Sequence, residues 1–147
     1  MRLSTKARYA LRAMMELALH EGEGPQLLRE IAQAQRLSVK YLEQLTIPLR
    51  HAGLVRSARG PNGGYELARP AAEITALDVV AAVEGPLTLL DCVGRTAACD
   101  RTATCVARQL WMRAGEAISA ALSDTSLAHL RDSQRAADTS DAFCYQI

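Results

Sequence analysis

The sequence has few aromatic residues and no long apolar run, and both absences limit what the protein can be. Phe, Trp and Tyr make up only 4% of the residues, although 49% are hydrophobic. The core must therefore be built mainly from Ala, Leu, Val and Ile, which suits closely packed helices. No stretch approaches the roughly 20 apolar residues of a membrane span, and residues 1–20 lack the pattern of a secretory leader. We therefore expect a cytoplasmic protein with no membrane contact.

Residue sets that mark common enzyme classes are also missing. The sequence shows no Ser-His-Asp set and no glycine-rich phosphate loop with a Lys, and few titratable residues lie outside its basic half. We therefore predict that the protein is not an enzyme.

Charge is divided unevenly along the chain, although the formal net charge is only +1. Residues 1–69 contain 11 Lys or Arg against 6 Asp or Glu, whereas residues 70–147 contain 6 against 10. The N-terminal half is therefore the candidate for binding an anionic partner.

Hydrophobic periodicity predicts a mainly α-helical chain with one small β-hairpin. Apolar residues recur at helical spacing over 5–20 and 26–35, and Ser38 is a typical N-cap for a third helix that Gly53 ends. Two short helices joined by a tight turn form a helix-turn-helix pattern. Residues 54–67 then predict two short strands around a glycine-rich tip, which would be the wing of a winged-helix domain.

Further helices are predicted in the C-terminal half. Thr75 caps one that ends at Gly85, and a longer helix runs from around Thr104 to Leu122. The longer helix carries a narrow apolar seam, small enough for two helices to approach closely, so the seam needs a partner. The seam consists of Val106, Leu110, Ala114, Ala117, Ile118 and Ala121.

The end of the chain predicts one more short helix, beginning in "SDTSLAHL", followed by a polar stretch without periodicity that we expect to be mobile. The predicted organisation is a winged helix-turn-helix domain at 1–70, a cysteine loop with dimerisation helices at 71–133, and a mobile tail at 134–147.

The third predicted helix offers hydrogen-bonding side chains near its N-terminus, as major-groove recognition requires. Glu43 can accept a hydrogen bond from a cytosine amino group, and Gln44 can pair with adenine. A polar helix face alone is more often simply solvated, but the wing adds cations beside backbone N–H groups, which suit phosphate or minor-groove contact. We therefore predict DNA binding. The candidate residues on this helix are Ser38, Lys40, Tyr41, Glu43 and Gln44.

Three of the four cysteines, Cys92, Cys99 and Cys105, lie in one short segment. Three thiols cannot all pair as disulfides, and clustered cysteines in a reducing compartment are more often ligands or redox sensors. Cys105 falls at the start of the long helix, where backbone N–H groups and the helix dipole favour a thiolate. The spacing alone leaves a metal or iron–sulfur site, redox thiols and a purely structural role open. Zinc ranks below a cluster, because structural zinc sites usually space their cysteines more closely.

Several segments, taken in order, resemble the IscR/NsrR/RirA type of winged-helix transcription regulator, and the IscR branch most. They are "MRLSTKARYALRAM", "SVKYLEQL", "LRHAGLV" and "RGPNGGYEL", followed by the three cysteines. The resemblance covers residues 1–130 and implies a homodimeric regulator, expected to act as a repressor, that binds near-palindromic DNA operators. It also implies an iron–sulfur cluster held by Cys92, Cys99 and Cys105, with a two-iron form slightly favoured over a four-iron form.

The same resemblance implies which residues contact DNA. The "YLEQL" motif places Glu43 and Gln44 among the base contacts, with Ser38 and Lys40 beside them, and Thr5 of the first helix is the candidate phosphate contact. The family's wing motif falls on Arg59, Gly60, Gly63 and Gly64.

Two positions depart from the family pattern. Some relatives ligate the cluster through a His three positions after the third cysteine, where this chain has Arg108, and others through an Asp of the first helix, where it has Arg8. The first two cysteines are also one residue further apart than is common in the IscR branch. The fourth ligand is therefore open, and the candidates are Cys144, a carboxylate of the partner subunit, His20, His51 and His129.

Other functions are compatible with the same residues. The cysteines could form a thiol switch, or a partner protein could control a regulator without a cluster. An iron–sulfur carrier is a further alternative, although a carrier needs neither a wing nor a base-reading helix.

Overall fold

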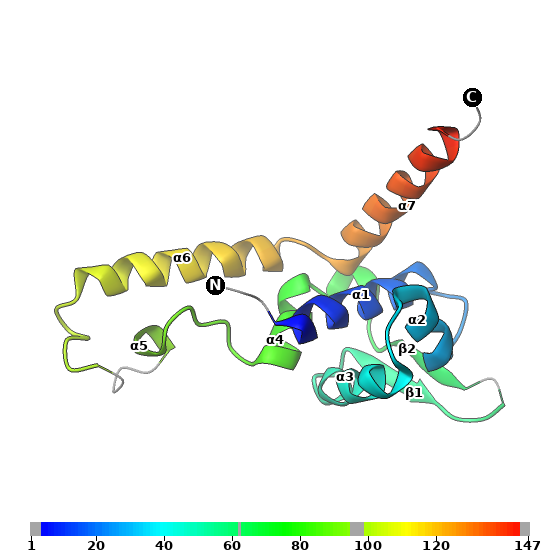
Figure 1. Ribbon diagram of the computed structural model, residues 1–147, viewed down its shortest axis with the longest axis horizontal. Coiled ribbons are helices and arrows are strands. Elements are labelled where there is room, and N and C mark those ends of the chain that lie inside the picture. The colour runs from blue at the N-terminus through cyan, green and yellow to red at the C-terminus, as the bar shows by residue number, and fades with distance from the viewer. Residues whose placement is uncertain (1–3, 62, 95–98, 145–147) are drawn as a thin grey trace.

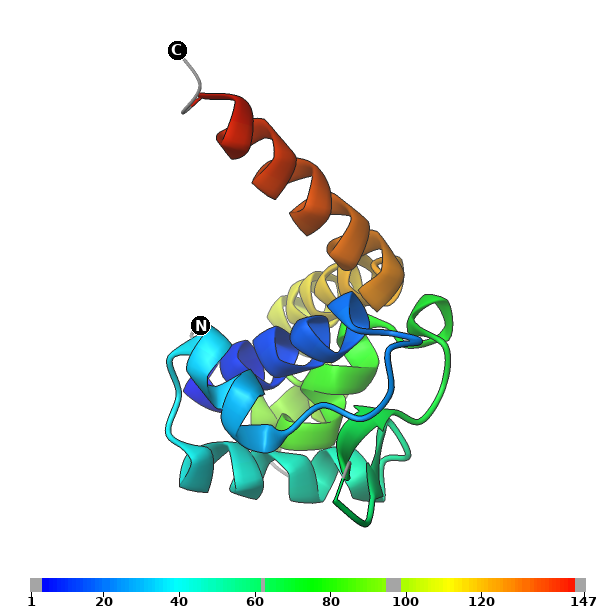
Figure 2. The ribbon, with the colours of Figure 1, turned by 90° about the vertical axis from the view of Figure 1, so that its right-hand side faces the viewer.

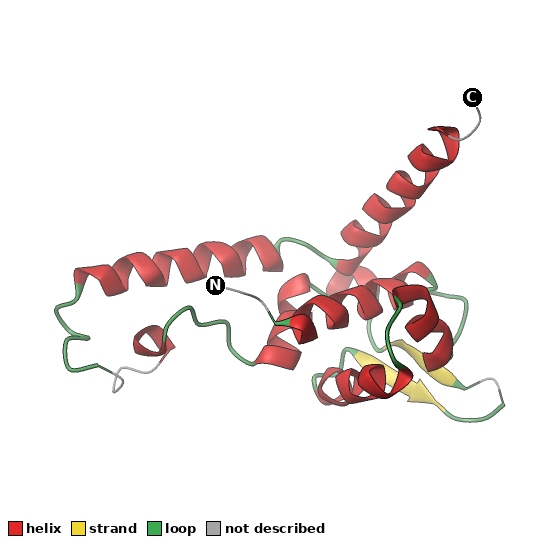
Figure 3. Cartoon of the chain, viewed as in Figure 1, coloured by secondary structure: helices red, strands yellow, loops and turns green. Residues whose placement is uncertain are grey.

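The protein is mainly α-helical with one two-stranded hairpin, as predicted (Figures 1 and 3). The computed structural model describes residues 4–61, 63–94 and 99–144, with side chains described as far as Thr139. In chain order the elements are α1 (Thr5–Leu19), α2 (Leu28–Gln35), α3 (Val39–His51), β1 (Val55–Ala58), β2 (Gly64–Leu67), the short 3₁₀ helix η1 (Ala71–Glu73), α4 (Ala76–Glu84), α5 (Asp91–Gly94), α6 (Val106–Ser123) and α7 (Leu127–Cys144).

The core lies where α1, α3 and α4 pack together, with α2 and the base of the wing closing it. Small residues on α1, among them Ala10 and Ala18, are fully buried and let the helices approach closely. Leucine and other aliphatic side chains fill the centre, so the predicted aliphatic core is confirmed. The largest fully buried side chains are Met14, Leu42, Leu49, Leu54, Ile74, Val79 and Leu127.

Side-chain caps fix where the helices begin. The Ser38 hydroxyl accepts a hydrogen bond from the Tyr41 N–H at 3.1 Å, so the predicted N-cap of α3 is confirmed. Thr75 forms a capping box with Asp78, in which each side chain accepts from the other residue's N–H, at 3.1 and 2.9 Å.

The wing is an antiparallel hairpin whose register pairs Val55 with Leu67 and Ala58 with Gly64. On its other side β2 is joined to the loop after α1, because Gln26 and Tyr65 exchange two backbone hydrogen bonds of 2.8 Å. One edge of β2 therefore pairs with β1 within the wing, and the other edge attaches the wing to the helical body.

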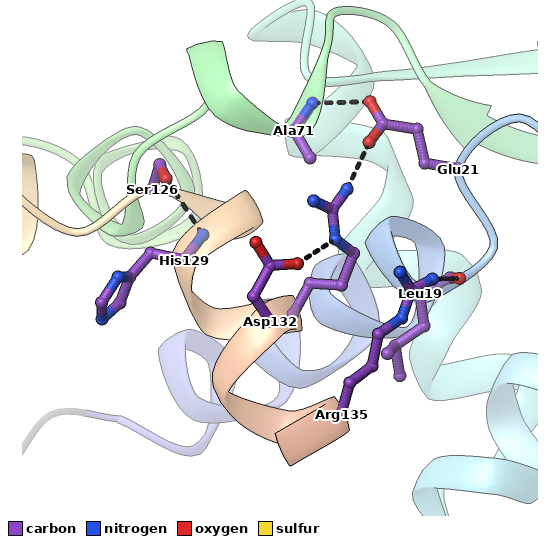
Figure 4. Close-up of polar contacts among 8 residues, drawn as sticks. Leu19, Glu21, Ala71, Ser126, His129, Asp132 and Arg135 are labelled. Carbon is purple, nitrogen blue, oxygen red and sulfur yellow. Dashed lines mark hydrogen bonds and ion pairs between the residues drawn. The ribbon is translucent and has the colours of Figure 1, made fainter.

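Helices α6 and α7 leave the winged domain in different directions (Figures 1 and 2). The base of α7 is held by polar contacts: Arg131 pairs with Glu21 at 2.7 Å, and the Arg135 guanidinium donates to the Leu19 carbonyl at 2.8 Å (Figure 4). Helix α7 extends through Cys144. The helix predicted to begin in this region is therefore longer than expected, and the mobility of residues 134–147 stays a prediction. In the part of the chain that the structure describes, no helix is both long and apolar enough to cross a membrane.

Candidate nucleic-acid interface and cysteine loop

Helix α3 separates buried from exposed residues cleanly. Leu42, Leu45 and Leu49 face the core, with 1%, 3% and 1% of their surface exposed. Lys40, Glu43 and Gln44 are exposed on the opposite side. Three of the predicted DNA-contacting side chains thus share one outward face, with their polar groups available to a ligand.

Tyr41 and Ser38, which are also predicted to contact DNA, make contacts within the protein. The Tyr41 ring is half-buried and meets the Tyr9 ring edge to face, with the ring centroids 5.9 Å apart. Ser38 caps the helix through its hydroxyl oxygen, which leaves the hydroxyl hydrogen free to be donated. Both residues therefore have a structural role, and their contact with DNA stays a prediction.

The tip of the wing exposes Arg59 and contains the three predicted glycines. Gly60 has φ +111°, a conformation that favours glycine, and its carbonyl accepts from the Gly63 N–H at 2.9 Å. A Cβ on Gly63 would lie 2.5 Å from the Ala58 oxygen, and one on Gly64 would lie 2.3 Å from the Gln26 oxygen. The turn accounts for Gly60 and Gly63 and the close approach of Gln26 for Gly64, and any contact that these glycines make with DNA stays a prediction.

Two arginines of α1, Arg8 and Arg12, lie beside the Tyr9 ring that contacts Tyr41 of α3. Thr5, the predicted phosphate contact, is exposed in the first turn of α1. The Arg8 guanidinium donates to the Tyr9 hydroxyl at 2.9 Å, and Arg12 donates to the Gln35 side chain at 2.8 Å. The acceptors in these hydrogen bonds are neutral groups and not carboxylates.

Sequence reasoning missed an apolar part of the outward face of α3. The exposed fraction is 53% for Ile47 and 41% for Val39. The signal was available, because both residues lie four positions from Glu43 and so on the same side of a helix. The sequence pattern had placed Val39 on the core-facing stripe of this helix with the leucines, which was wrong because Val39 is exposed, and Ile47 was not assigned to either side.

The three loop cysteines are free thiols in different surroundings. Cys92 lies in α5 and Cys105 is the N-cap residue of α6, both half-buried, whereas Cys99 is exposed. Their donor chemistry fits an iron–sulfur cluster, since thiolates are the usual ligands. Within the described residues, however, no three His, Cys, Asp or Glu side chains lie close enough together to hold a metal ion. The structure thus does not bring the three thiols together, and residues 95–98 between them lie outside the described part.

Arg108 links two parts of this loop. It stands in the first turn of α6, three residues after Cys105, and its Nε donates to the Cys92 carbonyl oxygen at 2.9 Å. Arg108 therefore links α5 to α6.

The candidates for a fourth ligand lie elsewhere. His20 lies at the end of α1 and bonds Glu23 at 2.7 Å; this bond, with the nearby Glu16, raises the pKa of the ring. The protonated ring has no lone pair for a metal. His51 and His129 are exposed on α3 and α7. The Cys144 side chain lies outside the described part of the chain.

The predicted seam of α6 is exposed in the single chain. The exposed fractions of Val106 and Leu110 are 77% and 59%, and Trp111, which was not predicted as part of the seam, is 42% exposed. Large apolar side chains gathered on one helix face are typical of an interaction surface.

The family model and similar sequences that match this chain describe transcriptional regulators. The model of a family described as Rrf2, iron-dependent transcriptional regulator, matches residues 3–133. The HTH-type transcriptional regulator IscR of Photorhabdus laumondii is 42% identical over 138 residues, which cover 94% of this chain and 84% of that protein.

Two solved structures have a similar fold. CymR, described as the global cysteine regulator of B. subtilis, aligns with a TM-score of 0.77 and 42% identity over 90% of this chain and 97% of that one. IscR of T. potens aligns with a TM-score of 0.75 and 39% identity over 92% of this chain and 90% of that one.

Proposed function

Because the chain belongs to the Rrf2 family of transcriptional regulators, we propose that it is a dimeric DNA-binding regulator in which α3 enters the major groove. The observation that supports this best is the exposed stripe of Lys40, Glu43 and Gln44 on a helix that packs against β1 of the wing, whose tip exposes Arg59. A helix with hydrogen-bonding side chains reads base edges, and the cations of the wing and α1 position it on the phosphates.

The dimer would form through the seam of α6. Two copies of α3 related by a twofold axis would meet operator half-sites that are about 34 Å apart, or a multiple of that distance. Affinity for such an operator depends on the spacing of the two helices, so a small change in the angle between subunits is sufficient for regulation. A tenfold change in binding corresponds to about 1.4 kcal/mol.

The sensing part of the proposal concerns the cysteine loop. Cys92, Cys99 and Cys105 are the residues that would hold an iron–sulfur cluster, which would supply sensitivity to iron, oxygen or nitric oxide. Cys105 is the N-cap residue of α6, and Cys92 is bonded to the same helix through Arg108. A change in how these two thiols are held therefore acts directly on the start of the proposed dimerisation helix.

DNA recognition is tested with an operator selected from random duplexes. Gln44→Ala should weaken binding to the selected operator about ten- to hundredfold, and leave binding to unrelated DNA unchanged. Arg59→Ala should weaken binding to both and lower the slope of log affinity against log salt by about one. If the wild-type protein selects no sequence, or if Gln44→Ala binds the operator as tightly, the proposed reading by α3 is wrong.

The cluster is tested on protein purified without oxygen. We expect visible absorption bands with stoichiometric iron and sulfide, and their loss in the variant with Cys92, Cys99 and Cys105 all changed to Ala. That variant should also lose the difference in operator affinity between anaerobic and aerated samples. Cys144→Ala is measured separately, because Cys144 is a candidate fourth ligand. A colourless wild-type protein, or a triple variant with unchanged operator response, contradicts the cluster.

A thiol switch is the second candidate, because the three thiols do not converge in the single chain. In this case the protein is colourless, while its operator affinity changes on mild oxidation and recovers with a thiol reductant. If operator affinity changes neither on exposure to air nor on mild oxidation and reduction, control by a partner protein is favoured.

A further inference from the structure

An exposed apolar side chain, Ile47, stands one helical turn beyond Glu43 on the proposed DNA-reading face. Val39, Glu43 and Ile47 follow one another at four-residue spacing, so they form one ridge along the outer side of α3. Ile47 is 53% exposed, although the leucines of the same helix are almost completely buried. Two hydrogen-bonding side chains are its neighbours on the helix surface: Glu43, four positions earlier, and Gln44, three positions earlier.

The surroundings of Ile47 indicate what covers it. In the major groove, thymine is the base whose edge carries an apolar group, the C5 methyl. A ligand that meets Glu43 and Gln44 with hydrogen-bonding groups and Ile47 with a methyl group therefore has the chemistry of a base sequence containing thymine.

We propose that Ile47 is a specificity-determining residue that contacts a thymine methyl in each operator half-site. This inference rests on the proposed function, since it requires that α3 enters the major groove. The contact places the thymine next to the base pair met by Glu43 or Gln44, because Ile47 is one helical turn further along the same face.

The expected effect is modest but measurable. Burial of one methyl group contributes about 0.8 kcal/mol, which corresponds to roughly a fourfold change in affinity. Removal of that methyl from the DNA and truncation of Ile47 remove the same contact, so the two losses should not add.

The experiment replaces each thymine of the selected operator in turn by deoxyuridine, which removes only the methyl group. Wild-type protein should lose about fourfold in affinity at one thymine of each half-site. Ile47→Ala should bind the thymine and deoxyuridine operators equally at that position, whereas the conservative Ile47→Val should keep most of the discrimination. Alanine is a better helix former than isoleucine, so α3 should not be weakened, and thermal unfolding checks this.

Three results would overturn the inference: wild-type protein that is indifferent to every replacement, Ile47→Ala that still discriminates, or Ile47→Ala that changes the oligomeric state, since Ile47 would then cover a protein surface. Failure of the proposed function looks different, because the wild-type protein would then select no operator at all.

Discussion

Gly64 stands where two backbone segments approach too closely for any side chain. A Cβ at this position would lie 2.3 Å from the Gln26 oxygen, which accepts the Tyr65 N–H. Gly64→Ala must therefore push β2 away from the loop after α1. We expect about 1–3 kcal/mol of destabilisation, as for other overpacked sites, and weaker operator binding because the wing moves. Urea unfolding and operator affinity measure the two effects.

Gly115→Ala is the matched control for this prediction. A Cβ on Gly115 would meet only the Leu89 Cγ, at 3.9 Å, and the residue lies inside α6. Alanine is favoured over glycine within a helix by about 0.5–1 kcal/mol, so this variant should be slightly more stable. A Gly64→Ala protein that unfolds at the wild-type urea concentration would show that the wing is not held at Gln26.

At the scale of elements, the sequence predicts those whose signals are local. The N-caps Ser38 and Thr75 were found because each cap bonds within its own helix turn. The extent of α7 was missed, since its base is held by Glu21 and by the Leu19 carbonyl, more than a hundred residues away in sequence. Periodicity contains no information about such distant partners.

The same distinction applies to the candidate site. The polar stripe of α3 was predicted from helical spacing, whereas the contact between Arg108 and Cys92 joins two elements across a loop. The sequence showed only that Arg108 cannot act as a ligand. Its use as a connection between α5 and α6 required the fold.

Arg108→Gln should release α5 from α6. A hydrogen bond with a charged donor contributes about 1.5–3 kcal/mol, and the bonded carbonyl of Cys92 lies near the surface, so we take the lower end of this range. Hydrogen exchange of the backbone amides around Cys92 should then become about tenfold faster in the cofactor-free protein. Mass spectrometry of peptides from this segment measures the change.

Arg113→Gln provides the control, since Arg113 is an exposed arginine on the same helix. It should leave exchange around Cys92 unchanged, and Arg108→Lys should give an intermediate rate. Equal exchange in the Arg108→Gln and wild-type proteins would mean that α5 is held by its other contacts with α6.

At the scale of the whole molecule, the two proposed activities lie on separate parts of the chain. The DNA-reading face belongs to α3 and the wing, whereas the cysteines lie between α4 and α6 (Figure 1). Helix α6 packs against α4, and α4 packs against both α1 and α3. A change at the start of α6 can therefore reach the DNA-reading face through packed helices or, in a dimer, by altering the angle between subunits.

A charge placed in the seam of α6 tests whether the dimer forms there. Leu110 lies in the seam of α6 and is 59% exposed in the single chain, so Leu110→Glu should place a charge inside the interface. Burying an unpaired charge is costly, and we expect a monomer at micromolar concentration by sedimentation analysis. Operator binding should fall with it, because each α3 would then bind a single half-site.

Gln109→Glu adds the same charge at the neighbouring position, which the helical repeat places outside the seam. This variant should remain dimeric and bind the operator like the wild type. If Leu110→Glu also stays dimeric, the subunits associate through another surface, and the exposed apolar residues of α6 need a different partner. If it becomes monomeric but binds the full operator unchanged, the spacing of two recognition helices does not determine affinity.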